Sequence, residues 1–184
     1  ADMMGIAKAI FINRMDKEHA DFDAAMAALD AAFGHRVGAV QIPIGAEQDL
    51  RGVIDIIRMK AYHHEGDQEE ILEIPAELAD MAEAARDKLC ELVAEADDDL
   101  MMKYLDGDRL SQEELETLLG KAIAQSIFIP VFVGSAITMQ GVEDLMDDIV
   151  TFFPEPTAHG PLTTVDGSEV PFSVEGDVAV QVFK

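Results

Sequence analysis

The chain has 184 residues, of which 49% are hydrophobic, and a formal net charge of −24. This acidic balance argues against direct DNA binding, because phosphate contacts need Lys and Arg, and against docking on an anionic membrane. The apolar fraction excludes general disorder, the single Cys excludes an internal disulfide, and no apolar run of about 18 residues is present to form a transmembrane helix. We therefore expect a globular, cytoplasmic protein. The chain starts at Ala1 and ends in a strand-like run, so we expect a fragment of a longer protein.

The first third of the chain alternates between strand and helix patterns. An apolar run at 7–13 predicts a buried strand. A helix is expected over about 19–33, with one apolar face and Gly34 as its end. Residues 40–44 and 53–57 read as strands, and 60–74 as another strand or hairpin. The expected inward face of the helix consists of Phe22, Met26, Leu29 and Phe33.

The middle of the chain is predicted to be helical. Pro75 suits a first helical turn, and apolar residues then recur every three or four positions up to Leu100. A second short helix is expected to end near Gly107, and a third begins at Ser111, which forms a capping box with Glu114. The continuous apolar stripe consists of Leu78, Met81, Ala85, Leu89, Leu92, Ala96 and Leu100.

Residues 127–133 predict a strand, perturbed by Pro130 because proline cannot donate a ladder hydrogen bond. A helix over 141–153 follows, and its inward face is expected to hold Val142, Leu145, Ile149 and Phe153. The order is therefore strand–helix, a long insertion, and strand–helix. Such outer units are typical of consecutive pieces of a doubly wound α/β sheet.

The segment Asn13-Arg14-Met15-Asp16 directly follows the first strand. Ligands of α/β proteins bind at the carboxyl ends of strands, where Asp16 could accept hydrogen bonds from N1–H and the exocyclic amine of guanine. Adenine lacks this pair of donors, so the carboxylate could select the base. Asn13 could brace the loop, and the stem of Arg14 could lie along the ring. The alternative is that Asp16 only caps the next helix.

Gly134-Ser135-Ala136 follows the second outer strand. Small residues allow the backbone to approach a ligand closely, so an amide here could donate to a purine oxygen. A plain turn is the alternative. The two segments support each other because both lie at strand ends.

Several segments in this order resemble translation elongation factor G. They are Phe-Ile-Asn-Arg-Met-Asp, Gln-Ile-Pro-Ile-Gly, Arg-Gly-Val-Ile-Asp, Glu-Ile-Pro-Ala-Glu-Leu, Ala-Glu-Ala-Asp-Asp-Asp-Leu-Met-Met-Lys-Tyr-Leu and Gly-Ser-Ala-Ile, and they span about residues 8 to 156. By this resemblance, Asn13 and Asp16 match the guanine-specificity motif, and Ser135 and Ala136 match the second base-contacting loop. The family usually has Lys at the position of Arg14, which indicates a divergent paralogue.

The resemblance implies part of a doubly wound, P-loop-type GTPase sheet with an inserted α+β subdomain. Residues 1–37 and 126–156 would belong to the G domain, 38–125 to the insertion, and 157–184 to a linker and the first strands of a β-barrel domain. The parent protein would hydrolyse GTP, with Mg²⁺, to drive ribosomal translocation or a related step of protein biosynthesis. A tetracycline-protection or peptide-release factor is the nearest alternative.

The chain itself has no phosphate-binding loop, because Gly120-Lys121 is followed by Ala122 instead of Ser or Thr. We therefore expect no catalytic residue, no metal site and no bound GTP or GDP in the fragment alone. Weak self-association through the edge of its first strand is expected.

The insertion carries most of the negative charge. Between Glu65 and Thr117 there are 19 acidic and 4 basic residues, which account for −15 of the −24. By resemblance, Glu91, Glu95 and Asp98 match acidic positions that meet the C-terminal domain of the ribosomal stalk protein. A solvated helix face is the alternative, and an acidic adaptor for a basic protein, without nucleotide, is the alternative function.

His63-His64 with Glu65 and Asp67 suggests a metal site only weakly, because adjacent strand residues point to opposite faces. Cys90 has no nucleophilic partner in the pattern and is expected to be a partly buried structural thiol.

Overall fold

The structure is a computed structural model that describes residues 5–65, 68–155 and 160–170. The chain divides into two units, Ala1–Phe153 and Pro154–Lys184. In the second unit, strands β8 (Leu162–Thr163) and β9 (Glu169–Val170) form a short antiparallel hairpin. The barrel strands expected from Val174 onwards lie outside the described residues.

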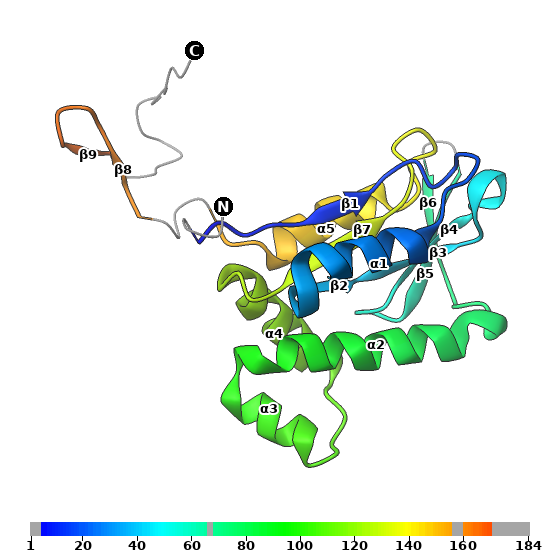
Figure 1. Cartoon of the computed structure of the whole chain (residues 1–184), viewed down its shortest axis with the longest axis horizontal. Coiled ribbons are helices and arrows are strands. Elements are labelled where there is room, and N and C mark those ends of the chain that lie inside the picture. Colours follow the sequence, from blue (N-terminus) through cyan, green and yellow to red (C-terminus); the bar gives the residue numbers. More distant parts are fainter. Residues whose placement is uncertain (1–4, 66–67, 156–159, 171–184) are drawn as a thin grey trace. The chain divides into compact units, whose positions relative to one another are not determined.

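The first unit contains a parallel sheet of three strands in the order β1-β7-β2. These strands are β1 (Ile10–Ile12), β2 (Val37–Ala39) and β7 (Ile129–Val133). Residues far apart in the sequence are thereby brought together, since Ile12 is the Cα partner of Val133. In Figure 1, helix α1 (Phe22–Phe33) lies in front of this sheet.

A second sheet of four antiparallel strands has the order β3-β4-β5-β6. Three helices follow it before the chain returns to β7, and α5 (Val142–Phe152) comes after β7. The strands are β3 (Gln41–Ile44), β4 (Gly52–Asp55), β5 (Lys60–Glu65) and β6 (Gln68–Leu72), and the helices are α2 (Ala79–Val93), α3 (Asp98–Leu105) and α4 (Gln112–Ala124). The architecture is mixed α/β, with a parallel and an antiparallel sheet.

Within the described residues, four short 3-10 helices connect these elements. They are Gly34–Arg36, Glu47–Asp49, Ala76–Leu78 and Ala94–Ala96. None of the helices in residues 5–65, 68–155 and 160–170 is long and apolar enough to cross a membrane.

Strand β7 is buried on both faces because its side chains alternate between two clusters. Ile129 and Val131 pack with Met26 and Leu29 of α1. Phe132 points the other way, into the main core. That core joins residues of both sheets to α2 and α4, including Ile42, Ile54, Leu89, Leu115, Leu118, Ile123 and Phe128.

The main core leaves no room for a side chain at Gly38 of β2. A Cβ there would lie 2.6 Å from Cδ1 of Leu92 and 2.8 Å from Cε2 of Phe128. Helix α2 can therefore pack directly against β2 only because position 38 is glycine.

The sequence analysis missed strand β2, which forms one edge of the parallel sheet. The strand has only three residues, one of them Gly38, so it carries no strand pattern. Pro130 is the second residue of β7, so the proline does not prevent the strand predicted over 127–133. The missing N–H is tolerated because pairing with β1 starts only at Val131.

The predicted apolar stripe packs in the main core except at Met81, which is 43% exposed, but it does not run along one continuous helix. Helix α2 ends at Val93, a 3-10 turn follows, and Asp97 starts α3. The carboxylate of Asp97 accepts hydrogen bonds from the backbone N–H groups of Asp99 and Leu100, and it pairs with Lys121 at 2.5 Å. An N-cap residue has extended backbone angles, which breaks the helical path.

The inward face predicted for α5 was wrong in part. Leu145 and Phe153 pack against the core, but Ile149 is 44% exposed. The fully buried positions of α5 are instead Asp144, Asp148 and Phe152. The partly buried Arg58 pairs with Asp148 on this face of the helix. The pattern of apolar residues along the sequence cannot indicate that α5 turns carboxylates inward.

Other predictions were confirmed. Helix α1 and the strands around 40–44, 53–57 and 60–72 are present. Helix α4 starts with the predicted capping box, in which Ser111 accepts from the Glu114 N–H and the Glu114 side chain accepts from the Ser111 N–H. Cys90 is buried in the main core, and burial raises the pKa of its thiol, as expected for a structural cysteine.

Candidate functional site

The two segments singled out in the sequence meet at one edge of the parallel sheet. Strands β1 and β7 run side by side and end level with each other, at Ile12 and Val133. The loops that follow are joined by backbone hydrogen bonds, from the Gly134 N–H to the Ile12 carbonyl at 3.0 Å and from the Met15 N–H to the Gly134 carbonyl at 3.1 Å. The carboxyl ends of the strands thus form a single surface.

Asp16 supplies a carboxylate to this surface. Its Oδ1 accepts a hydrogen bond of 2.7 Å from the Ser135 hydroxyl, and its Oδ2 lies 2.6 Å from Nζ of Lys17. Hydrogen bonds from Lys17 and then from Ser135 hold the pKa of Asp16 below its ordinary value. The carboxylate is therefore a pure acceptor at neutral pH, and each oxygen keeps a lone pair for another donor.

Asp16 does not cap helix α1. That role belongs to Asp21, whose Oδ1 accepts from the Ala24 N–H at 2.9 Å. The side chain of Asp16 contacts instead a loop that is 119 residues away in the sequence.

Asn13 connects the same two loops. Its Oδ1 accepts from the Ala136 N–H at 3.0 Å and from the Arg14 N–H at 2.7 Å. Arg14 is exposed and has a φ of 64°, so the chain turns sharply between Asn13 and Asp16. The five residues predicted from the sequence, Asn13, Arg14, Asp16, Ser135 and Ala136, lie in these two joined loops.

Gln140 connects the loop of this surface to the antiparallel sheet. The sequence motifs did not indicate a role for this residue. Its backbone carbonyl accepts from the Ser135 N–H at 3.0 Å. Its side chain exchanges two hydrogen bonds with the backbone of His64 in β5, at 3.0 and 2.7 Å. A buried glutamine that bridges two sheets depends on the tertiary fold, so a single sequence offers no signal for it.

A group of buried charges lies between β4 and α5. Nη1 of Arg58 lies 2.5 Å from Oδ2 of Asp55 and 2.8 Å from Oδ1 of Asp148. Burial, and then the nearby Asp55 charge, raises the pKa of Asp148 to about 7. Burial and the nearby Glu69 and Asp55 charges raise the pKa of Asp144 to about 8. One arginine thus faces more carboxylates than it can neutralise.

The acidic positions predicted to bind a partner are all exposed, but they lie on three different elements. Glu91 is on α2, Glu95 is in the 3-10 turn, and Asp98 is the first residue of α3. The three positions therefore do not share one helix, because the chain bends at Asp97. The three carboxylates flank this bend.

A cavity of about 750 Å³ is lined by Met15 but not by Asp16 or Ser135. Residues of α1, of the β3 region and of α2 line it, including Phe22, Met26, Ile42, Ala85 and Leu92. Its lining is mainly apolar and lacks the polar groups of the strand-end surface.

No protein family model matches the sequence. A crystal structure of a protein from Thermus thermophilus is similar to the chain, with a TM-score of 0.77 and 27% sequence identity. The similarity covers 88% of this chain and 24% of the other. The chain therefore spans about a quarter of the length of that protein.

Proposed function

We propose that this chain recognises the guanine base in a GTP-binding protein that resembles translation elongation factor G. One observation carries the proposal: Ser135 holds the Asp16 carboxylate at the adjacent ends of two parallel strands. In this proposal the parallel sheet is part of a P-loop-type GTPase sheet, and β3–β6 with α2–α4 form its inserted subdomain.

The chemistry of Asp16 suits guanine. An ionised carboxylate can accept from both N1–H and the exocyclic amine, whereas adenine would leave it facing an acceptor nitrogen and without its partners. Asn13 and Arg14 would contact the edge and face of the base, and the Ala136 backbone would lie close to the purine oxygen. Phosphate binding, Mg²⁺ and hydrolysis would come from segments of a longer protein, which would drive ribosomal translocation or a related step.

The test is Asp16→Asn in a longer protein that carries this chain together with a phosphate-binding loop. An amide can also donate, so it should match guanine less well and should suit xanthine, which has a carbonyl in place of the amine. We expect GTP affinity to fall at least tenfold and XTP affinity to rise, measured by competition against a fluorescent nucleotide.

Asp23→Asn is the matched control, because Asp23 is an exposed carboxylate in the first turn of α1. It should leave both affinities unchanged. Equal GTP affinity in the Asp16→Asn and wild-type proteins would refute guanine recognition by Asp16.

A second role is supported by the exposure of Glu91, Glu95 and Asp98. We propose that these carboxylates bind a basic protein domain, for which the resemblance indicates the C-terminal domain of the ribosomal stalk protein. An acidic adaptor without a nucleotide would use the same surface, and the Asp16→Asn experiment distinguishes the two functions.

A further inference from the structure

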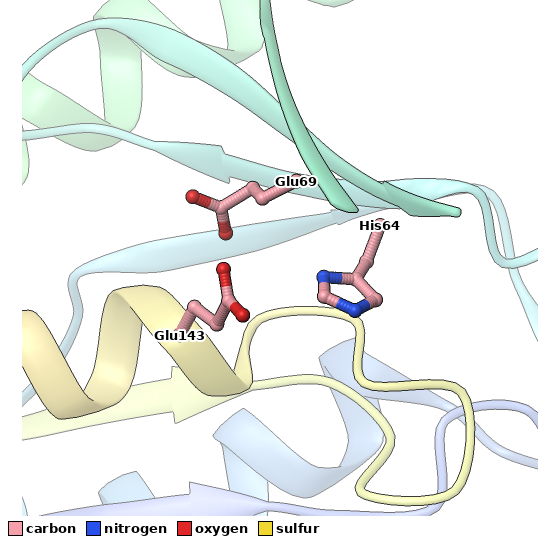
Figure 2. A group of neighbouring side chains, drawn as sticks. All are labelled: His64, Glu69 and Glu143. Atoms are coloured by element: carbon pink, nitrogen blue, oxygen red, sulfur yellow. The ribbon is translucent and has the colours of Figure 1, made fainter. Parts of the chain in front are cut away.

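We propose that His64, Glu69 and Glu143 form a binding site for a divalent transition-metal ion of the Zn²⁺ type. The proposal stands independently of guanine recognition. Figure 2 shows the three side chains turned toward one another, two from the antiparallel sheet and one from helix α5. One ligand atom of each residue lies within 4.8 Å of those of the other two.

The backbone places these side chains on one face. His64 in β5 and Glu69 in β6 are direct cross-strand partners, and opposite residues of an antiparallel pair project to the same side of the sheet. Glu143 lies in the first turn of α5, which faces that side. The neighbours His63 and Glu70 project to the other side. This is why the sequence pattern His63-His64 did not reveal the cluster.

His64 supplies an observation independent of the carboxylates. The residue is 8% exposed, and its buried Nδ1 has no hydrogen-bond partner. Figure 2 shows a ring nitrogen directed toward Glu69 and Glu143. Gln140 fixes the backbone of His64 through two hydrogen bonds. A buried imidazole nitrogen without a partner is costly, and coordination of a metal ion would satisfy it.

Within the described part of the chain, Glu69 and Glu143 also have no Lys or Arg as an ion-pair partner. Burial, followed by the Glu143 charge, raises the pKa of Glu69. A bound divalent cation would compensate both carboxylates.

The donor set selects the class of metal. One imidazole and two carboxylates, with water in a fourth position, suit Zn²⁺ at ligand distances of about 2.0–2.2 Å. Mg²⁺ and Ca²⁺ prefer oxygen ligands only. The ligand atoms would need to draw together slightly, which the half-buried glutamates permit.

The experiment is a calorimetric titration of Zn²⁺ into the full, tag-free chain at pH 7 after treatment with a chelator. We expect one Zn²⁺ per chain and a higher Tm with Zn²⁺, but no comparable effect with Mg²⁺. In the unaltered chain, NMR should show a Zn²⁺-dependent shift of the His64 ring signals, which requires no folded variant.

The variants test the ligands one at a time. Glu143→Gln and Glu69→Gln should each weaken Zn²⁺ binding at least about tenfold, the loss that even outer partners of metal ligands produce. Glu70→Gln is the matched control on the opposite face of β6, and His35→Asn removes an exposed histidine elsewhere. Both should bind Zn²⁺ like the wild type.

Two outcomes would overturn the proposal. One is weak binding of several Zn²⁺ ions that Glu143→Gln and Glu70→Gln leave equally unchanged, because it would indicate general attraction to an acidic surface. The other is the absence of any Zn²⁺-dependent shift of the His64 ring. Neither outcome bears on the nucleotide experiment.

Discussion

The hydroxyl of Ser135 donates a 2.7 Å hydrogen bond to Oδ1 of Asp16, although 119 positions separate the two residues. This contact fixes one oxygen of the carboxylate and leaves the side chain ionised. It also ties the loop after β1 to the loop after β7. A substitution that moves the loop after β7 should therefore also affect the position and the pKa of the Asp16 carboxylate.

Ser135→Ala should raise the pKa of Asp16 toward its ordinary value. The hydroxyl is the second-largest cause of the lowered pKa, after Lys17. A carboxyl group with a lowered pKa stabilises the fold above its unfolded pKa, and that stabilisation is lost as the pH falls through the folded value. In the variant, the free energy of unfolding should therefore depend less steeply on pH in the acidic range. An NMR pH titration of the Asp16 carboxyl carbon measures the shift, with Thr138→Ala as control, and an unchanged pKa would contradict it.

Gly134→Ala should displace the loop that carries Ser135. A Cβ at this position would lie 2.0 Å from the backbone oxygen of Gln140, which accepts from the Ser135 N–H. Overpacking of this kind costs roughly 1–3 kcal/mol, measurable by urea denaturation.

Gly120→Ala in α4 is the control for that substitution. Its added Cβ would meet only the Phe152 carbonyl oxygen, at 3.9 Å, and alanine is favoured over glycine in a helix by roughly 0.5–1 kcal/mol. Equal stability of the two variants would show that the loop can move freely.

Stability should fall as the pH rises from about 4 to about 7. The pKa of Asp148 is raised to about 7 from an ordinary value of 3.8, so the native state binds more protons than the unfolded state over this range. Asp148→Asn removes the charge, while Arg58 keeps its contact with Asp55. The free energy of unfolding of the variant, relative to that of the wild type, should therefore increase by on the order of 2 kcal/mol from pH 5 to pH 8, since one pKa unit corresponds to about 1.4 kcal/mol.

Denaturation curves at the two pH values check that prediction. Asp30→Asn is the control, because Asp30 is an exposed carboxylate of α1 that does not contribute to the shifted pKa of Asp148. Groups around Asp148 that also titrate or carry charge are Asp55, Arg58, Asp144 and Asp147. A wild-type stability that rises from pH 5 to pH 8 would show that other groups dominate.

Reversing Glu91, Glu95 and Asp98 to Lys should slow association with the stalk-protein domain several-fold at low salt. Charges at the rim of an interface act mainly on the association rate, and salt screens them. The difference should shrink at about 0.15 M salt and above. Stopped-flow binding at two salt concentrations provides the measurement, with circular dichroism as the folding check.

The matched control for charge reversal changes Asp23, Asp30 and Glu70 to Lys. These carboxylates are exposed on α1 and β6, so the change in net charge is the same at a different place. Equal slowing in both triple variants would mean that net charge alone acts, and that the bend at Asp97 has no docking role.

Local patterns in the sequence predicted what depends on neighbours along the chain. The capping box at Ser111 and the two strand-end loops require only adjacent residue types and strand order. The face of α5 could not be predicted in this way, because Arg58 pairs with Asp148, 90 positions later. The same holds for His64 and Glu143, whose proximity depends on how the two sheets meet.

The close contact of Gly38 with Leu92 and Phe128 couples the substitutions that these three positions can accept during evolution. The glycine belongs to β2 of the parallel sheet, and Leu92 belongs to α2, which follows the antiparallel sheet. Phe128 immediately precedes β7, where the chain re-enters the parallel sheet. A larger residue at position 38 becomes acceptable only if one of the other two shrinks. Relatives should therefore show linked substitutions at these three positions. For the same reason, the segment between β2 and β7 should not be interchangeable between relatives as an independent unit.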